Sequence, residues 1–329
     1  MNKLGGREIV ILSESIEDYN QEDLDHYLPA LTRIKEQLTN VGVTTRVVEV
    51  TKSIEEALAT IDPAKVVIFN WCEELDGVPN TYSLAPPVLE KLGFCYTGSN
   101  AAALTLTQNK KLTKEVLISN GISTPKATFY LPGESARGWD VFPAIIKPVT
   151  EHCSEGITRD SVVQSREELE HQLSFALARF KDGAFVEEFI DGPEYMVSVW
   201  GGLEYEVLPI VELDYSKLAS LKDKIFSFNA KWVKDSFEYT VITETFPEIG
   251  EPLKSTIDRL AIDAFVKTGC ANYGRLEIRI KGSVPYVLDV NANPDMVGPN
   301  EFIMSAQKLG YNQGEMVLKI CEFALEIRR

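Results

Sequence analysis

Charged and amide side chains alternate with apolar ones along residues 273–291, the segment of the chain with the clearest potential for chemistry. This period of two is typical of half-buried strands, and a turn in the middle would fold the segment into a hairpin. The resulting register places Glu277 opposite Asp289. It also places Arg275 opposite Asn291. Because opposed side chains have Cβ atoms about 4.5–5.5 Å apart, the two carboxylates would repel each other unless a cation or a shared proton lay between them.

The side chains of this hairpin suit a hard divalent cation. Glu277, Asp289 and Asn291 offer only oxygen atoms, and Mg²⁺ prefers oxygen ligands and commonly keeps substrate phosphate oxygens in its shell. The turn that follows, residues 291–296, could direct backbone N–H groups at developing negative charge. The alternatives are an amphipathic hairpin with a solvated charged face and an ordinary turn rich in Asn and Pro.

Three lysines stand where a nearby anion would explain them. Lys147 ends an apolar strand predicted for residues 143–147, and lysine is seldom buried without a partner. Lys110 opens a predicted helix, where a cation opposes the helix dipole. Lys231 lies in residues 228–232, which we interpret either as a mobile loop that brings the lysine to a phosphate or as a polar strand. Snorkelling and the commonness of lysine at helix starts are the alternatives for the first two.

Residues 184–194 are typical of a strand, a hinge and a second strand. The backbone of such a hinge can pair with the edge of a planar heterocycle. Glu187 or Glu194 can accept hydrogen bonds from amino or hydroxyl groups. Solvated surface glutamates are the alternative.

The elements that must position these residues indicate an α/β protein. In the first hundred residues, short apolar strands alternate with a helix-spaced pattern, which predicts a parallel sheet with helices on its faces. Ligands of such sheets bind at the carboxyl ends of the strands, and those ends contain Glu14 and Glu73. We expect three units: residues 1–98, a parallel α/β unit; residues 99–187, a small central α+β unit; and residues 188–329, an α+β unit that carries the hairpin.

The composition excludes several classes of protein. The 329 residues carry a formal net charge of −16, which disfavours nucleic acid or an anionic membrane as a partner, because both require a basic surface. Apolar runs stay below the ~18 residues of a membrane-spanning helix, and the first residues lack a signal-peptide core. Five scattered cysteines without a CxxC pair favour reduced thiols. These features predict a cytoplasmic protein with small-molecule partners.

Seven motifs, taken in order, resemble the ATP-grasp superfamily and, within it, the D-alanine–D-alanine ligase family. The similarity runs from about Gly93 to the last residue, over more than two thirds of the chain. Each motif is weak alone, whereas seven in the right order and spacing are specific. The motifs are residues 96–99, 109–114, 146–148, 186–194, 230–232, 274–277 and 289–294.

The resemblance implies an ATP-grasp fold and an ATP-dependent, ADP-forming ligase that joins a carboxylate to an amine through an acyl phosphate. It implies ATP contacts at Lys110, Lys147, Ser154, Glu187, Phe189, Ile190, Glu194 and Lys231. It implies two Mg²⁺ ions, with Mn²⁺ as an alternative, at Glu277, Asp289 and Asn291. It implies catalytic roles for Arg275, Lys231 and Asp295, the last through backbone N–H groups near it. The family also suggests a homodimer.

The chain departs from the family pattern where the family binds its amino acids. Trp232 stands where tyrosine is usual, Asp295 replaces a glycine, and Asn300 replaces a serine. Glu14, Glu73, Trp232 and Asn300 are the candidate substrate contacts. We therefore expect the family reaction on a different pair of amino-acid-like or carboxylic acid substrates. A genuine D-alanine–D-alanine ligase and a non-catalytic nucleotide-binding protein are the alternatives.

Overall fold

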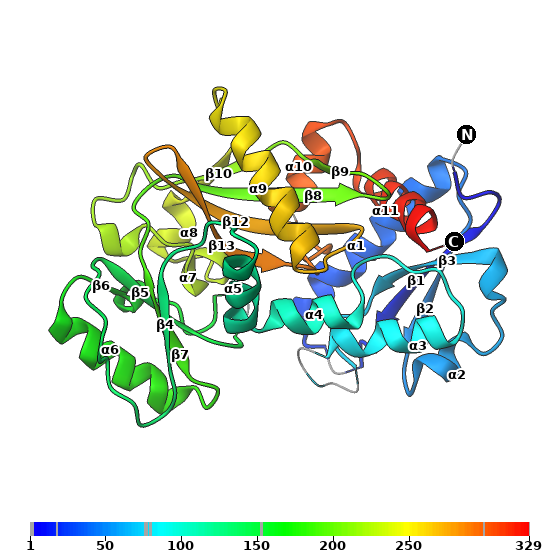
Figure 1. Cartoon of the computed structure of the whole chain (residues 1–329). Helices are drawn as coiled ribbons and strands as arrows, with labels where there is room; N and C mark the ends of the chain where they lie inside the picture. The colour runs from blue at the N-terminus through cyan, green and yellow to red at the C-terminus, as the bar shows by residue number, and fades with distance from the viewer. Residues whose placement is uncertain are drawn as a thin grey trace.

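The computed structural model describes residues 3–17, 19–75, 78, 81–151, 154–298 and 300–328. Within these ranges the strands form three sheets, each contributed mainly by a different part of the chain (Figure 1). The first sheet lies at one end of the molecule, the second at the other, and the third between them. The boundaries 98/99 and 187/188 between the expected units stay a prediction.

The first sheet is parallel, as the alternation of strand and helix patterns predicts. It has the order β2-β1-β3. The apolar strands are buried on both faces, as is usual for parallel sheets. Its elements are β1 (Glu8–Glu14), α1 (Gln21–Asn40), β2 (Thr45–Val50), α2 (Ile54–Leu58), the 3-10 turn η1 (Pro63–Lys65), β3 (Val66–Trp71), the 3-10 turn η2 (Tyr82–Leu84) and α3 (Ala85–Lys91).

The second sheet is antiparallel with the order β4-β7-β5-β6, and α6 packs against it. The predicted helix behind Asn109 begins at Lys110, because the Asn109 side chain accepts a hydrogen bond from the backbone N–H of Leu112. The elements of this part are α4 (Ala101–Gln108), α5 (Lys110–Ser119), β4 (Ala127–Tyr130), β5 (Ala144–Pro148), η3 (Arg159–Ser161), β6 (Val162–Val163), α6 (Arg166–Arg179) and β7 (Ala184–Glu188).

The third sheet has the order β11-β10-β8-β12-β13, with β9 paired to β8, and α9 packs on it. Its strands are β8 (Glu194–Gly201), β9 (Tyr205–Val207), β10 (Val211–Asp214), β11 (Thr243–Thr245), β12 (Tyr273–Lys281) and β13 (Val284–Asn291). Its helices and 3-10 turn are η4 (Leu221–Asp223), α7 (Phe228–Trp232), α8 (Phe237–Val241), α9 (Leu253–Lys267), α10 (Glu301–Lys308) and α11 (Gln313–Ile327).

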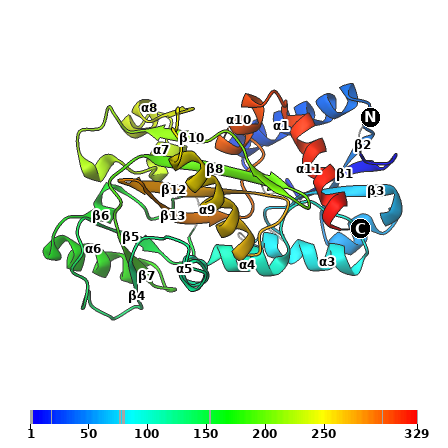
Figure 2. The same cartoon turned by 45° about the horizontal axis from the view of Figure 1, so that its top comes forward.

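The last helix returns to the first sheet. Buried side chains of α11, such as Val317 and Ile320, share one core with Ile9, Ile11 and Phe69. Figure 2 shows α11 beside α1 and next to the strands of the first sheet. The two ends of the chain are thereby packed together, so that the edge of the first sheet has a fixed position relative to the third.

One prediction of local structure is wrong. Residues 228–232 form the short helix α7 and not a loop or a polar strand. The Ser227 side chain accepts a hydrogen bond from the backbone N–H of Ala230 and so caps the helix. The prediction overlooked this cap because the polar residues of the segment alternate as in a strand. Within the described ranges, no helix combines the length and the apolar character needed to cross a membrane.

Candidate active site

The hairpin register predicted from the sequence is confirmed. β12 and β13 pair with Glu277 opposite Asp289 and with Arg275 opposite Asn291. The register shifts by one residue directly after Glu277. The two carboxylates are therefore direct neighbours across the ladder.

Two ammonium groups approach these carboxylates. Lys231 Nζ lies 3.8 Å from Glu277 Oε1, and Lys110 Nζ lies 3.5 Å from Asp289 Oδ2. Lys110 Nζ also donates a hydrogen bond of 2.9 Å to the carbonyl oxygen of Glu151. The first residue of α5 and the last turn of α7 thus each bring a cation to one carboxylate of the hairpin.

The electrostatics of the pair fit a divalent cation. Burial raises the pKa of Glu277, Lys231 lowers it in part, and the neighbouring Asp289 raises it again. A cation between the two carboxylates would remove this repulsion. Asn291 supplies a third oxygen, since its Oδ1 already accepts a hydrogen bond from the backbone N–H of Asn293 and still has a second lone pair. In the described part of the chain, no cluster of three or more His, Cys, Asp or Glu side chains could hold a metal. A set of three oxygen ligands at the hairpin therefore requires the amide oxygen of Asn291.

Lys147 is part of a buried triad of charges. Its Nζ donates to Glu187 Oε2 at 2.9 Å, and Lys114 Nζ lies 2.5 Å from Glu187 Oε1. Burial would raise the pKa of Glu187, but the two ammonium groups hold it below its usual range. Sequence reasoning missed Lys114, although it lies one helical turn after Lys110 on the face of α5 that also carries buried Leu117.

The triad borders a cavity of about 50 Å³ between the second and third sheets. β5 and β7 line one side of it, and β12 and β13 line the other. Lys147, Ser154, Glu187, Phe189, Ile190, Glu194 and Glu277 all contribute to its wall. The structure thus brings most of the expected ATP-contacting residues to one place.

Ser154 borders this cavity in the left-handed backbone region, with φ of 63°. Non-glycine residues adopt this region infrequently. The Ser154 hydroxyl donates a hydrogen bond of 2.8 Å to the carbonyl oxygen of Phe226, on the far wall of the cavity. The loop after β5 is therefore tied to the segment that leads into α7.

Glu194 is the centre of a second buried charge cluster. Arg279 Nε and Nη2 donate to Glu194 Oε2 at 2.9 and 2.6 Å, and the hydroxyl of Tyr215 donates to the same oxygen at 2.8 Å. Burial would raise the pKa of Glu194, but Arg279 keeps it below its usual range. Sequence reasoning missed Arg279 and Tyr215. The signal for Arg279 was its place two residues after Glu277 on the same strand face.

The other catalytic candidates, Arg275 on β12 and Asp295 after β13, both have partners at the start of α10. Arg275 Nη1 lies 2.5 Å from Glu301 Oε2, a partner that the sequence did not suggest. Asp295 Oδ1 accepts a hydrogen bond of 2.7 Å from the backbone N–H of Val297. The Asn300 side chain caps α10 and donates to the carbonyl oxygen of Asp295 at 2.6 Å, so it fixes the turn that carries Asp295.

The remaining substrate candidates lie at the carboxyl edge of the first sheet and on α7. Glu14 accepts hydrogen bonds from the backbone N–H of Glu73, at 2.8 Å, and from the hydroxyl of Tyr19. Glu73 is exposed to solvent. Its pKa is nevertheless raised to about 8, because neighbouring atoms desolvate the carboxylate and because Asp295 and Glu14 lie nearby. Trp232 is 53% exposed. Residues 76–77 stand at the position of a family motif that this chain lacks. They lie outside the described residues.

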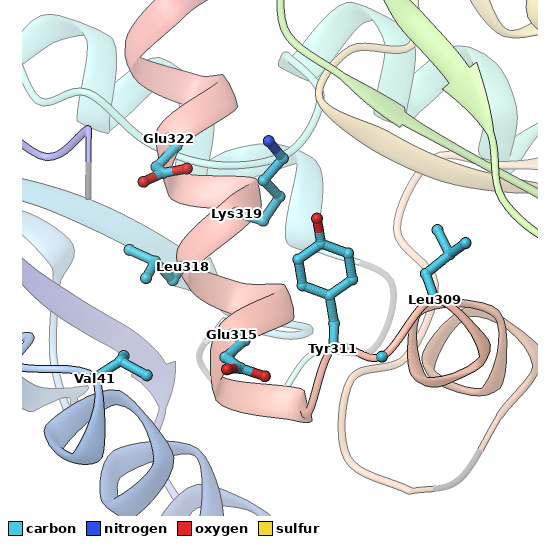
Figure 3. A pocket seen from close by; sticks show the side chains of 8 residues that line it. Val41, Leu309, Tyr311, Glu315, Leu318, Lys319 and Glu322 are labelled. Carbon is cyan, nitrogen blue, oxygen red and sulfur yellow. The ribbon is translucent and has the colours of Figure 1, made fainter. Parts of the chain in front are cut away.

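A larger hollow of about 300 Å³ lies elsewhere, between the end of α1 and α11. Figure 3 shows Val41, Leu309, Tyr311 and Leu318 at its wall. Its carboxylates have structural partners: Glu315 caps α11, and Glu322 accepts a hydrogen bond from the backbone N–H of Lys3. The size of a hollow is a weaker guide than converging charges, so we place the site at the smaller cavity.

Comparison with known proteins identifies the family. The family described as "D-ala D-ala ligase C-terminus" matches residues 132–322. A D-alanine–D-alanine ligase of Marinomonas sp. (strain MWYL1) is 31% identical over 241 residues, which is 72% of this chain and 71% of that protein. D-alanine–D-alanine ligase B of Xanthomonas campestris pv. campestris is 29% identical over 246 residues, 72% of each chain.

Solved structures show the same architecture. The D-alanine–D-alanine ligase of Bacillus anthracis, complexed with ATP, superposes with a TM-score of 0.72 at 20% identity and covers 98% of both chains. The ligase of Coxiella burnetii gives 0.69 at 16% identity, over 97% of this chain and 94% of that one. The fold is therefore ATP-grasp, as expected from the motifs. The chain belongs to the D-alanine–D-alanine ligase family. It is an ADP-forming, ATP-dependent C–N ligase.

Proposed function

We propose that this ligase joins two amino-acid-like substrates through an acyl phosphate, and that the substrate pair differs from two D-alanine molecules. The observation that carries the proposal is the hairpin carboxylate pair, Glu277 and Asp289, faced by Lys231 and Lys110 beside the cavity that Lys147 lines. Positioning and neutralisation of oxygen charge account for most of the catalysis of phosphoryl transfer, and this arrangement supplies both.

ATP would lie in the cavity between the second and third sheets. Lys110 and Lys147 would contact its phosphates, and Lys231 would contact the γ-phosphate. Glu187 and the backbone at Phe189 and Ile190 would bind adenine, and Glu194 would bind the ribose. Ligand pockets commonly enclose about 300–1,000 Å³, so entry of the nucleotide requires the cavity walls near Ser154 and Phe226 to move apart.

Glu277, Asp289 and Asn291 would hold Mg²⁺, two ions by family analogy, with Mn²⁺ as an alternative. Bound there, the ions supply positive charge to the phosphate oxygens. The neighbouring lysines add to this charge without being ligands. The carboxylate repulsion described above supports this assignment.

The chemistry is the one that the family resemblance implies, and the arrangement of charges suits it. A carboxylate oxygen of the first substrate attacks the γ-phosphorus and ADP leaves, which gives an acyl phosphate. The amine of the second substrate attacks the acyl carbon, and phosphate leaves from the resulting tetrahedral species. Arg275 and backbone N–H groups near Asp295 would stabilise the oxyanion, and Glu301 would orient the guanidinium. Lys231 and Trp232 on α7 would cover the site and exclude water, which would otherwise hydrolyse the acyl phosphate.

The substrate side supports a pair other than D-alanine. Glu14, Glu73, Trp232, Asn300 and the side chain of Asp295 would form the substrate-binding surface. A carboxylate at position 295 adds negative charge beside the proposed oxyanion site, where the family has only a hydrogen atom. The second candidate is a genuine D-alanine–D-alanine ligase, which the relatives in Xanthomonas campestris pv. campestris and Marinomonas sp. favour. A homodimer and the division at residues 98 and 187 remain proposals.

Release of phosphate from ATP, measured against a panel of D- and L-amino acids and other carboxylic acids, tests the proposal. We expect turnover with an acid and amine pair other than two D-alanines, and no turnover in Lys147→Ala. Turnover with D-alanine alone would instead support the second candidate. Full activity of Lys147→Ala would contradict the assignment of the site.

A further inference from the structure

The Arg279 guanidinium is deeply buried in the wall of the nucleotide cavity, with 3% of the residue exposed. It stands directly opposite Glu194 across β12 and β8. Desolvation of an unpaired guanidinium would be strongly unfavourable, so a buried arginine needs a complete set of acceptors. In this chain the set comes from three separate segments.

Each of these three segments contributes one acceptor beside the cavity. Arg279 Nη1 donates to the carbonyl oxygen of Ile190 at 2.9 Å, and Nη2 donates to the carbonyl oxygen of Lys224 at 2.5 Å. Nε and Nη2 form the two hydrogen bonds to Glu194. The guanidinium also stacks over the Phe189 ring, with its carbon 4.6 Å from the ring centroid. Arg279 thus joins the hinge after β7, the start of β8 and the segment after η4.

The contacts at Glu194 are strongly asymmetric. Arg279 and Tyr215 donate to Oε2, whereas Oε1 takes no part in these three contacts. Glu194 lines the cavity. Three donors, Nε and Nη2 of Arg279 and the hydroxyl of Tyr215, thus hold Oε2 in place, and these contacts leave Oε1 for a ligand in the cavity.

We propose that Arg279 is a positioning residue that fixes Glu194 so that Oε1 faces the ribose, and that it thereby sets the preference of the enzyme for ribonucleotides over deoxyribonucleotides. This inference rests on the proposed placement of ATP. Arg279 itself contacts the protein and acts through Glu194. Loss of a hydrogen bond to a charged group that is held in place lowers affinity by roughly tenfold or more.

Binding of ATP, 2′-deoxyATP and 3′-deoxyATP to the full chain, measured by calorimetry with Mg²⁺, tests the proposal. Wild type should bind at least one deoxynucleotide about tenfold more weakly than ATP. Arg279→Met should bind all three within about twofold of one another. Arg259→Met, an exposed arginine on α9, is the matched control and should keep the wild-type ratio.

A double-mutant cycle separates positioning from a purely structural role. Glu194→Gln should lose the same discrimination, and Arg279→Met in the Glu194→Gln background should change the ratio by less than about twofold. The double variant also leaves no unpaired buried charge, which keeps the test open if Arg279→Met alone does not fold. Arg279→Lys retains the charge without the fork and should recover only part of the discrimination.

Arg279→Met with the wild-type discrimination, or wild type without any, would overturn the inference. The readout is independent of ligation. A wild type that discriminates and loses this in Arg279→Met, yet forms no product with any acid and amine, would retain the inference and refute the ligase proposal. If wild type formed product while Arg279→Met kept the wild-type ratio of ATP to deoxynucleotide binding, the ligase proposal would stand and the inference would be refuted.

Discussion

The carboxylates on the two sides of the site have opposite electrostatic environments. On the nucleotide side, Glu187 and Glu194 are buried, but cations of the chain hold their pKa values below the usual range. On the substrate side, burial raises the pKa of Glu14 and of Asp295, and desolvation by neighbouring atoms, with Asp295 nearby, raises that of the exposed Glu73 to about 8. The nucleotide side is thus neutralised within the protein, whereas a substrate ammonium group would relieve the other side.

This difference explains why the family resemblance is strong for the nucleotide and weak for the substrates. A site whose charges are paired internally accepts one ligand with little rearrangement and tolerates few substitutions. Where the ligand balances the charges of a site, the residues of that site differ when the ligand differs. On the proposed assignment, Asp295 belongs to a site of the second kind.

The largest effect on activity is expected from Glu277, which lies between the nucleotide side and the substrate side. Glu277→Gln removes one of the two hairpin carboxylates, and we expect kcat/KM for ligation to fall by about 10²–10³, the loss typical of one electrostatic contact to the transition state. The measurement is the initial rate of phosphate release with Mg²⁺ and ATP. Glu170→Gln, on the exposed face of α6, is the control and should retain full activity. An unchanged rate in Glu277→Gln would remove the basis of the site.

An intermediate effect is expected from Lys114, which compensates Glu187. Lys114→Met leaves Glu187 with Lys147 as its cation, and we expect the free energy of unfolding to fall by about 3 kcal/mol and KM for ATP to rise about tenfold. Urea unfolding and steady-state kinetics measure the two changes. Lys111→Met, on the exposed side of the same helix, should behave as wild type. If both variants unfolded alike, the triad would not stabilise the nucleotide side.

The smallest effect concerns the substrate side and pH. The raised pKa of Glu73 means that the folded protein binds a proton that the unfolded chain releases near pH 4.5, so this contribution to stability is present in acid and is lost as the pH rises through about 8. Because Glu73 is exposed, solvent screening reduces this contribution to roughly 1 kcal/mol. Compared with Glu73→Gln, wild type should therefore lose about 2 °C more in Tm between pH 5 and pH 9. Parallel Tm curves would show that Glu73 does not titrate in this range.

The sequence predicted those parts of the molecule that depend on local patterns. The hairpin register follows from a period of two, and the helix that Lys110 opens was also predicted from the sequence. Partners that depend on tertiary packing escaped prediction. Lys114 reaches Glu187 on β7 from α5, a helix that packs against α9 and β13, and Glu301 reaches Arg275 from a position 26 residues further along the chain. The helix at residues 228–232 was missed because its five residues carry little helical periodicity.

The transfer of oxygen from substrate to phosphate tests the central claim most directly. The acid substrate identified in the panel would be labelled with ¹⁸O in its carboxylate, and the phosphate released during ligation would be analysed by mass spectrometry. Attack of that carboxylate on the γ-phosphorus, followed by departure of phosphate from the acyl carbon, predicts one ¹⁸O atom in each phosphate released. Unlabelled phosphate accompanying the formation of labelled amide product would contradict the acyl-phosphate route.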